Sequence, residues 1–453
     1  MTLGEGPRAR VSPARTCAYA VLRRVFEQGA YADHALRAEA KNLDARDRAL
    51  AMRLAYGAIQ RKGTLDHLIG LFAERPAERV DAPLLAALRL GCYELLYLDG
   101  APPHAVVAGA VELAKTEARA GHGLVNAVLR RCAREGSDLL AGLTDRTADQ
   151  AAIKHSHPSW LAELWWSELG ADEARALMAA DNEPSELAIR ANTLVTDAPT
   201  LSKDMAAAGV PVRRDPDIPE ALVLDGPFDA LASRFWREGA FVVQSRGAML
   251  VARALGPEPG EAVLDLCAAP GNKTTHLAAL MSGQGRIVAV ERDRRRAGAL
   301  VRAAQRLHAD NVHVELADAA APRPEGPVFD RVLVDPPCSG LGTLQARPDL
   351  RWRASPERLA ELQRVQASIL AAGAEALRPG GVLVYSTCTI STAENDRQIA
   401  SFLEGHPSFA LDDLGADLPA LRNPSPSAPE TVLTLPHRDR TAGFFVARLR
   451  KGA

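Results

Sequence analysis

The sequence predicts a multidomain protein with an all-α N-terminal bundle, a small α+β middle domain and a C-terminal α/β domain that contains a doubly wound, Rossmann-like sheet. Apolar residues recur three and four positions apart from Thr16 to about Arg134, which indicates helices. After Ala248, β-branched apolar runs alternate with helical stretches, as in a parallel sheet with helical crossovers. The chain of 453 residues is long enough for about three domains. The expected domains are residues 1–150, 151–246 and 247–453.

Short breaks separate the N-terminal helices. Gly100-Ala101-Pro102-Pro103 must interrupt a helix, because proline lacks the amide hydrogen that the helix requires. Gly121-His122-Gly123 precedes a further helical run, Leu124–Cys132. The stretch from Gly136 to about Gln150 has weak periodicity and is predicted to be a linker. His157-Pro158-Ser159-Trp160 then begins a Trp-rich helix, so the first domain boundary is placed before it.

Short apolar runs predict the strands of the two remaining domains. In the middle domain they are accompanied by helices Trp160–Leu169 and Asp172–Asp181. In the C-terminal domain five runs are separated by Ala- and Arg-rich helical stretches, and two later runs could extend the sheet. The predicted strands are Leu187–Arg190, Ala221–Leu224 and Ala240–Val243, then Ala262–Cys267, Arg286–Glu291, Val312–Asp318, Asp330–Asp335 and Gly381–Thr387, with Thr431–Leu435 and Gly443–Leu449 as the later runs.

The composition, with 47% hydrophobic and 24% charged residues, is that of a folded soluble protein. Since 54 basic and 56 acidic residues leave a net charge of −2, any binding of nucleic acid must use local patches. The first ten residues lack the apolar run of a secretory signal, and no apolar stretch is long enough to span a membrane. We therefore expect a cytoplasmic protein without a membrane partner. The six cysteines are scattered singly without a C-x-x-C pair, which predicts neither a metal site nor a disulfide framework.

The run Val263–Thr275 reads as an apolar strand, a turn of small residues and the start of a helix. In an open α/β sheet a ligand binds beyond the carboxyl end of such a strand. A phosphate-binding P-loop is excluded, because no glycine stands at the required position before Lys273. The G-x-G-x-x-G turn of dinucleotide-binding proteins is absent as well. The ligand must therefore be recognised in another way.

Acidic residues end three successive strands of the predicted sheet: Glu291, Asp318 and Asp335. An acid at the end of the second strand commonly binds ribose hydroxyls, because a carboxylate accepts two hydrogen bonds in a fixed geometry. Alternatively, each acid could cap the helix that follows its strand. Three acids at successive strand ends favour a nucleoside-like cofactor.

Two cysteines also stand at predicted strand ends. Cys338 lies in Asp335-Pro336-Pro337-Cys338-Ser339-Gly340, and Cys388 lies in Tyr385-Ser386-Thr387-Cys388-Thr389. Their shared location at the ligand-binding edge indicates chemistry. Cys17, Cys92 and Cys132 lie in helical apolar patterns instead and are expected to pack in the core.

These motifs resemble those of the Sun/Fmu group of RNA cytosine-5 methyltransferases, in particular the bacterial small-subunit rRNA enzymes. Leu264–Gly271 with Lys273-Thr274 is similar to the cofactor motif, and the runs around Cys338 and Cys388 are similar to the two cysteine motifs. The N-terminal part resembles the NusB-type RNA-binding domain. That second resemblance rests on Leu88-Arg89-Leu90-Gly91-Cys92-Tyr93-Glu94-Leu95, Val111-Glu112-Leu113-Ala114-Lys115 and Val125-Asn126-Ala127-Val128-Leu129-Arg130.

The resemblance implies S-adenosylmethionine as the cofactor, 16S rRNA as the partner and cytosine 967 as the type of target. It implies that Cys388 is the nucleophile, that Cys338 assists product release and that Asp335 recognises the base. The nucleophile would form a transient covalent bond to carbon 6 of the ring. Nothing in the sequence demands more than a monomer. The cofactor-binding residues that it implies are Cys267, Ala268, Ala269, Pro270, Gly271, Asn272, Lys273, Glu291, Asp318 and Asp335.

Three positions depart from the family pattern. Asn272 replaces a second glycine, so the turn is expected to need a positive φ at this asparagine. Ala110 replaces an acid, and Ser245 stands where Asp is usual. Arginines form two clusters that could contact RNA or simply be solvated. They are Arg292, Arg294, Arg295 and Arg296, for which a solvated face is favoured, and Arg347, Arg351 and Arg353 around Trp352.

Three alternatives stay open. An adenine amino-group methyltransferase uses a related Asp/Asn-Pro-Pro motif but normally closes it with an aromatic residue, where this chain has Cys338. A noncatalytic RNA-binding assembly factor would account for the helical domain equally well. Finally, Cys338 could be the nucleophile in place of Cys388, because sequence order does not decide between them.

Overall fold

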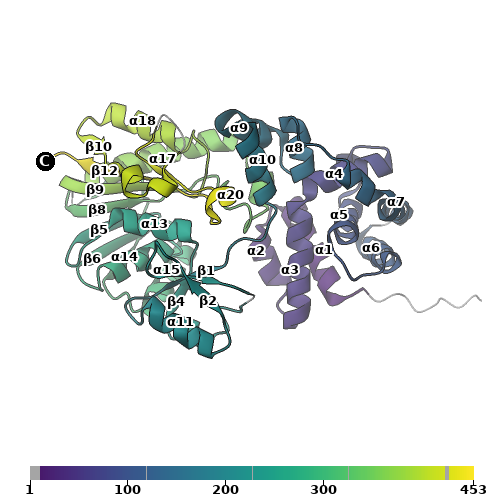
Figure 1. The fold of residues 1–453 in the computed structure, drawn as a ribbon, viewed down its shortest axis with the longest axis horizontal. Coiled ribbons are helices and arrows are strands. Elements are labelled where there is room, and N and C mark those ends of the chain that lie inside the picture. The colour runs from purple at the N-terminus through teal and green to yellow at the C-terminus, as the bar shows by residue number, and fades with distance from the viewer. Residues whose placement is uncertain (1–10, 119, 227, 325, 424–427) are drawn as a thin grey trace, which may run out of the picture. The chain divides into compact units, whose positions relative to one another are not determined.

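The computed structural model describes residues 11–118, 120–226, 228–324, 326–423 and 428–453. The first ten residues, which entered the expectation about a secretory signal, lie outside this range. The chain forms two compact units (Figure 1). The first comprises the residues up to Glu183 together with Leu344–Arg353, and the second comprises Pro184–Thr343 and Ala354–Ala453. The division into three domains at residues 150 and 246 stays a prediction, because compactness is a different criterion from domain ancestry.

The first unit is helical, as the periodicity predicts. Helix α1 begins where Ser12 accepts a hydrogen bond from the backbone N–H of Arg15 and proline occupies the first helical position. The helices of this unit are α1 (Pro13–Gln28), α2 (Ala32–Glu39), α3 (Ala45–Gln60), α4 (Lys62–Ala73), η1 (Ala77–Arg79), α5 (Ala82–Tyr97), α6 (Pro103–Glu117), α7 (His122–Ala141), α8 (Ala148–His155), α9 (Ser159–Leu169), α10 (Ala171–Ala180) and the separate α16 (Leu350–Arg353).

The prediction of a linker from Gly136 is wrong at its start, because Gly136 lies inside α7. A Cβ atom at this position would lie 2.8 Å from Leu96 Cδ2 and 3.2 Å from Cys132 Sγ. Glycine therefore permits close packing of α7 on α5 and does not end the helix. The expectation that Cys17, Cys92 and Cys132 pack in the core is confirmed, since all three are buried.

The charged residues of the Leu88–Leu95 motif are buried ion-pair partners in α5. Arg89 donates two hydrogen bonds to Asp66, over 2.7 and 2.8 Å, and Glu94 pairs with Arg15. Gly91 gives room to Leu129, whose Cδ1 would lie 2.7 Å from an added Cβ, and to the buried Ala110. Ala110, which stands where the family pattern has an acid, is thus buried against α5.

The segment Leu344–Arg353 is part of the helical unit, although it follows the Cys338 motif in the chain. Arg351 is fully buried and donates to the carbonyl oxygens of Ser156 (3.0 Å) and Asp181 (3.0 Å). Trp352 donates from Nε1 to the carbonyl oxygen of Ile59 over 2.7 Å, and Arg353 donates to that of Gly29 over 2.7 Å. The suggestion that Arg351 contacts RNA is therefore wrong, because its buried guanidinium donates to backbone carbonyl oxygens inside the protein.

The second unit contains a small antiparallel sheet with strand order β2-β3-β1-β4. Strand β2 was not predicted from the sequence, because its three residues include two exposed arginines. The strands are β1 (Ala188–Ala191), β2 (Val212–Arg214), β3 (Ala221–Leu224) and β4 (Phe241–Val243), accompanied by α11 (Ala198–Ala207) and α12 (Arg234–Arg237).

Buried polar contacts attach the small sheet to the rest of the second unit. Arg190 in β1 donates to Gln244 Oε1 (2.9 Å) and to Thr275 Oγ1 (3.2 Å), and burial lowers the pKa of its guanidinium to about 9. His276 contacts Glu220 over 2.6 Å. Ser245 caps the next helix by accepting from the N–H of Ala248, so it performs the capping role that an Asp would have.

The large sheet has strand order β10-β12-β9-β8-β5-β6-β7, with β11 paired to β12. Strands β5 to β9 are parallel, and β12 is antiparallel to both β9 and β10. The predicted doubly wound fold is confirmed, and the two late runs do extend the sheet. Its strands are β5 (Ala262–Leu266), β6 (Arg286–Glu291), β7 (Val312–Leu316), β8 (Phe329–Val334), β9 (Leu377–Thr387), β10 (Phe409–Leu411), β11 (Val432–Leu433) and β12 (Phe445–Lys451).

Helices flank this sheet, and the chain reverses direction of winding at β5, between β6 and β8. The turns after β5 and β8 therefore lie side by side at the carboxyl edge, which is where α/β proteins bind ligands. The helices and the 3-10 turn are α13 (Arg246–Leu255), α14 (Asn272–Leu280), α15 (Arg294–Arg306), α17 (Pro356–Ala376), α18 (Asp396–Gly405), α19 (Leu414–Asp417), η2 (Pro419–Leu421) and α20 (Pro436–Asp439).

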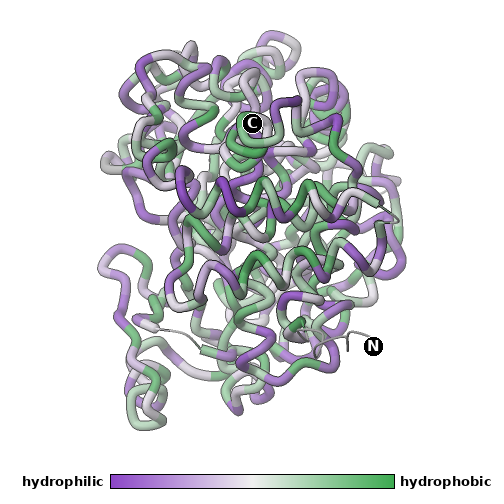
Figure 2. The backbone as a smooth tube through the Cα atoms, turned by 90° about the vertical axis from the view of Figure 1, so that its right-hand side faces the viewer, coloured by the Kyte–Doolittle hydropathy of each residue, from purple (hydrophilic) through white to green (hydrophobic). Residues whose placement is uncertain are grey.

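Hydrophobic and hydrophilic stretches alternate along the chain, as Figure 2 shows, and each unit has its own buried clusters. In the described part of the chain, no helix combines the length and the apolar character needed to cross a bilayer.

We predict that Arg351→Ala lowers the free energy of unfolding of the helical unit by about 3 kcal/mol, because hydrogen bonds from a buried charged group are lost and carbonyl acceptors are left unpaired. Urea titration monitored by circular dichroism measures this change. The exposed Arg353→Ala is the control, and its effect should be about 1 kcal/mol or less. Equal effects of the two substitutions would contradict the structural role of Arg351.

Candidate active site

The turn between β5 and α14 depends on two residues in the left-handed region. Cys267 has φ of 65° and Gly271 has φ of 104°. A Cβ on Gly271 would lie 2.4 Å from Leu300 Cδ1, so glycine is required both by conformation and by space. The expectation of a positive φ at Asn272 is wrong, because Asn272 is already the first residue of α14 and Gly271 makes the turn. The turn thus brings the backbone N–H groups at the start of α14 to the ligand-binding edge.

Asp265 lies near the end of β5 and stabilises the start of α14 from beneath. Its Oδ2 accepts a hydrogen bond of 2.6 Å from Thr274, and the side chain is buried. Burial raises the pKa of the Asp265 carboxyl to about 7, although the hydrogen bond from Thr274 opposes this.

Asp335 connects a helix, a loop and a strand at the carboxyl edge. It follows β8, accepts a hydrogen bond of 2.7 Å from Lys273 Nζ at the start of α14, and accepts one of 3.0 Å from Ser386 Oγ in β9. Burial lowers the pKa of Lys273, but the Asp335 carboxylate outweighs this and leaves the pKa above its ordinary value. Lys273 is therefore a fixed cation beside the candidate cysteines.

Cys338 and Cys388 are brought together from the loops after β8 and β9, with 3.3 Å between their Sγ atoms. The hydrogen bond to Cys388, together with burial, raises the pKa of the Cys338 thiol well above its ordinary value. The charge of a Cys388 thiolate also raises the pKa of Lys273, so the Lys273 ammonium in turn stabilises negative charge on that sulfur. The third cysteine of this edge, Cys267, differs from these two, because burial raises the pKa of its thiol to about 12.

Glu291 ends β6 and is buried. Its Oε1 accepts from the N–H of Asp293 over 2.9 Å. Its Oε2 accepts no hydrogen bond from the described residues, although Arg296 Nη1 lies 3.3 Å away. A buried carboxylate oxygen with unused acceptor capacity fits a ribose hydroxyl, so the residues present fit a nucleoside cofactor.

Asp318 is exposed and lies two residues beyond the end of β7, so the predicted strand Val312–Asp318 is too long at its end. Its Oδ1 accepts from the N–H of Ala320 over 3.0 Å, which shows that it also stabilises its own turn. The four arginines that follow β6 are all exposed, Arg292 just before α15 and the others in its first turn, in agreement with the solvated face that the sequence favoured for them. Arg296 also donates to the carbonyl oxygen of Ala269 over 2.7 Å.

Sequence reasoning missed the residues that hold the two cysteine loops. They are Ser339, Gln366, Ser386, Glu394 and Asn395. Ser339 and Ser386 stood inside the recognised motifs without an assigned role. Glu394-Asn395 could have been noticed as an acid and an amide shortly after Cys388, but nothing in a single sequence shows that these side chains are buried.

Three sequence models of known families match this chain. Residues 252–450 match the family described as 16S rRNA methyltransferase RsmB/F. Residues 12–134 match the NusB family, and residues 157–230 match the ferredoxin-like domain of RsmF/B-like methyltransferases. A protein of Synechocystis sp. named probable ribosomal RNA small subunit methyltransferase B is 37% identical over 448 residues, which cover 97% of this chain and 99% of that protein.

The chain belongs to the RsmB/F family of 16S rRNA methyltransferases. A Bacillus subtilis protein with the same name as the Synechocystis relative is 34% identical and is similar over 96% of this chain and 98% of its own length. The crystal structure of PH0851 has a TM-score of 0.82 at 29% identity, covering 98% of this chain and 100% of that one. The family resemblance and the fold class predicted from the sequence are thus confirmed. Members of the RsmB/F family are S-adenosylmethionine-dependent RNA methyltransferases of the 5-methylcytosine type, so this chain is an enzyme.

We predict that Asp265→Asn gains stability relative to the wild type as the pH rises. The carboxyl titrates near pH 4 when unfolded and near 7 when folded, so the folded state holds the extra proton between these values and the wild type loses stability as pH rises through them. Urea midpoints at pH 5 and pH 8 measure the effect, which should be on the order of a few kcal/mol. A difference between variant and wild type that is the same at both pH values would refute the buried, protonated carboxyl.

Proposed function

We propose that this enzyme transfers a methyl group to carbon 5 of a cytosine in 16S rRNA, at the site of the cytosine 967 type, through a covalent adduct with Cys388. The observation that supports this best is the pair of thiols at the carboxyl edge of the sheet, 3.3 Å apart, beside the Lys273–Asp335 ion pair. Since all four residues come from one chain, we propose that it acts as a monomer.

Carbon 5 of cytosine is a weak nucleophile until a thiolate adds to carbon 6 and converts the ring to an enamine. Cys388 suits this role better than Cys338. The hydrogen bond to Cys388 keeps the proton on Cys338, while the Lys273 ammonium stabilises the charge that Cys388 must carry. The new bond joins Cys388 Sγ to carbon 6, and the electron pair of the double bond moves towards carbon 5.

Cys338 would assist the release of the product. Once Cys388 is bonded to carbon 6 its negative charge is gone, so the effect that raised the pKa of Cys338 is weakened and this thiol can give its proton to solvent. The resulting thiolate takes the proton from carbon 5, the carbon 5–carbon 6 double bond forms again, and Cys388 leaves as a thiolate.

Asp335 would recognise the base at N3 or N4. Its two oxygens accept one hydrogen bond each from Lys273 and Ser386, which leaves further acceptor capacity and fixes the carboxylate against rotation. A preorganised hydrogen-bonding group at this point stabilises the charge that develops on the ring during attack.

S-adenosylmethionine, when bound, supplies the methyl group. Glu291 would accept hydrogen bonds from its ribose hydroxyls, and the turn Cys267–Lys273 would line the remainder of its site through backbone N–H groups. Asp318 would lie at the edge of this site, and Asp335 at its boundary with the base. Residues 12–134, which match the NusB family, would bind rRNA, and the target base must be unstacked before it can reach the thiols.

The proposal is tested by bisulfite mapping of 16S rRNA from cells that lack this protein and are complemented with wild type or with Cys388→Ala. We expect modification of one cytosine with the wild type. With the variant this modification should be lost, because without the nucleophile the rate of transfer falls at least about 1,000-fold. Modification that persists with Cys388→Ala would reject its role. Modification that is present without either protein would reject the substrate.

In the same system, Cys338→Ala should accumulate an enzyme–RNA adduct that survives denaturing electrophoresis, because release stalls after attack. The double variant Cys338→Ala/Cys388→Ala is the matched control and should form no adduct. An adduct in Cys388→Ala but not in Cys338→Ala would exchange the two roles. A noncatalytic assembly factor would form no adduct with any variant.

We also predict that Glu291→Gln raises the KM for S-adenosylmethionine about tenfold or more with a smaller effect on kcat, since a hydrogen bond to a charged group is worth about 1.5–3 kcal/mol. Asp293→Asn is the control. Asp293 caps α15 only two residues away, and asparagine caps a helix equally well, so its KM should be that of the wild type. An unchanged KM in Glu291→Gln would remove this residue from the cofactor site.

A further inference from the structure

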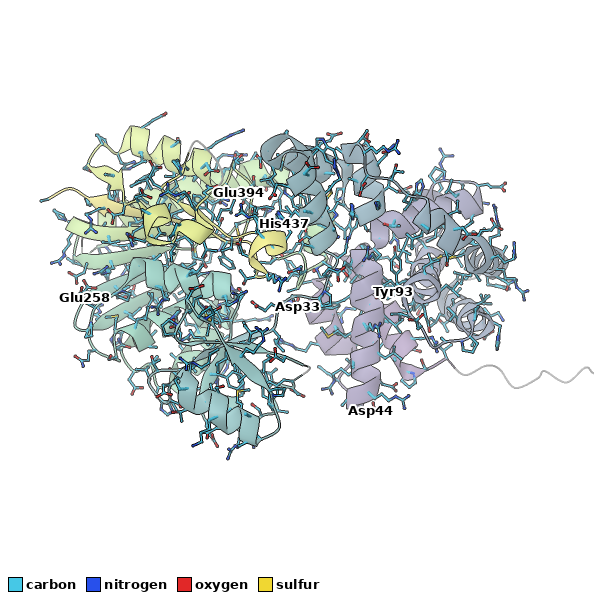
Figure 3. The ribbon with its side chains drawn as sticks, in the orientation of Figure 1. Asp33, Asp44, Tyr93, Glu258, Glu394 and His437 are labelled. Atoms are coloured by element: carbon cyan, nitrogen blue, oxygen red, sulfur yellow. The ribbon has the colours of Figure 1, made fainter. Side chains whose placement is uncertain are left out.

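Two consecutive residues, Glu394 and Asn395, are buried next to the cysteine loops. They follow β9 and precede α18, and their exposed fractions are 0% and 1%. Glu394 is among the labelled side chains of Figure 3. A buried carboxylate is costly unless several donors surround it, so its partners indicate what it is for.

Glu394 holds the loop that carries Cys338. Its Oε1 accepts from the backbone N–H of Ser339 over 2.9 Å, and its Oε2 accepts from the hydroxyl of the same residue. Gln366 in α17 donates to Glu394 Oε1 (2.9 Å) and to the carbonyl oxygen of Pro337 (3.0 Å). The residues on both sides of Cys338 are therefore fixed through one carboxylate.

Asn395 holds the loop that carries Cys388 in a corresponding way. Its Oδ1 accepts from the hydroxyl of Thr387 over 2.6 Å, and its Nδ2 donates to the carbonyl oxygen of Thr389 over 3.0 Å. The residues on both sides of Cys388 are thus fixed as well.

The two loops are joined to each other by further contacts. Ser339 Oγ and Thr389 Oγ1 lie 2.8 Å apart, and the N–H of Gly342 donates to the carbonyl oxygen of Cys388 over 3.0 Å. The hydrogen bonds of Glu394, those of Asn395 and these links form one network around the thiols. The side chains of Glu394, Asn395 and Ser339 are hydrogen-bonded within this network, which makes the arrangement rigid, whereas Gln366 Oε1 has no hydrogen-bond partner among the described residues.

We propose that Glu394 and Asn395 are positioning residues that set the separation of the two catalytic thiols, Glu394 through the Cys338 loop and Asn395 through the Cys388 loop. The chemical consequence of this positioning rests on the function proposed above, whereas the geometric claim does not. Neither residue transfers a proton or touches the reacting atoms. Each acts by holding the residues on both sides of one cysteine.

The geometric claim is tested by oxidation with diamide, which takes two electrons and two protons from the thiols as the disulfide forms. Wild-type enzyme should form the Cys338–Cys388 disulfide readily, because the sulfurs are 3.3 Å apart. We expect Glu394→Ala and Asn395→Ala to slow this at least about tenfold, since an error of position near 1 Å can cost a factor of 100 in rate. Mass spectrometry of the linked peptides excludes a contribution from Cys267.

Conservative variants separate positioning from loss of fold. Glu394→Gln keeps one carbonyl oxygen for the N–H of Ser339 and for Gln366, and its amide can donate to the Ser339 hydroxyl oxygen, so its rate should lie within about threefold of the wild type. Asp396→Asn is the matched control, because the adjacent Asp396 accepts a hydrogen bond from Asn423. Disulfide formation at the wild-type rate in both alanine variants would overturn the proposal. So would equal slowing in Asp396→Asn.

The chemical consequence has its own readout. Glu394→Ala should accumulate the RNA adduct, as Cys338→Ala does, whereas Asn395→Ala should form little adduct, as Cys388→Ala does. Slower disulfide formation without an adduct in Cys338→Ala would support the positioning role and reject the proposed reaction. An adduct in Cys338→Ala, with wild-type rates of oxidation and turnover in Glu394→Ala and Asn395→Ala, would support the proposed reaction and reject the positioning role.

Discussion

The carboxylate of Asp335 links helix α14, the loop after β8 and strand β9, and the site depends on this link. Lys273 lies in the first turn of α14, Asp335 directly after β8 and Ser386 in β9. The side chains of Lys273 and Asp335 are only 15% and 26% exposed, so their charges are partly removed from water and each needs the other. The ion pair therefore joins the region suited to a nucleoside cofactor to the region that contains the thiols.

Around this pair the protein uses polar groups where a hydrophobic core would be simpler to fold. Glu394, Asn395, Thr387 and Thr389 are all buried and hydrogen-bonded at the base of the cysteine loops. Such a network adds little to net stability, because desolvation offsets most of its gain. The network instead fixes the geometry of the cysteine loops. Hydrogen bonds specify the angle and the register of a loop, which apolar contacts leave free.

Much of the fold could be predicted from the sequence, because repeating signals carry it. The alternation of apolar strands and helices predicts a parallel, doubly wound sheet, in which residues at strand ends such as Glu291 and Cys388 meet at one edge. The rest depends on contacts between distant residues. Nothing local shows that Gly136 lies inside a helix or that Glu394 is buried against Ser339, 55 positions earlier. Asn272 was misjudged because the φ of a residue is decided by where the helix begins, which a change of one position alters.

The segment Leu344–Arg353 belongs to the helical unit, although the residues before and after it in the chain belong to the second unit. If residues from Pro184 onward were expressed alone, Arg351 and Trp352 would therefore lack the carbonyl oxygens of Asp181 and Ile59 to which they donate. The helical unit without this segment would in turn keep unfilled acceptors in its interior. A cut between Glu183 and Pro184 would therefore separate hydrogen-bonding partners and yield two damaged fragments in place of two independent modules.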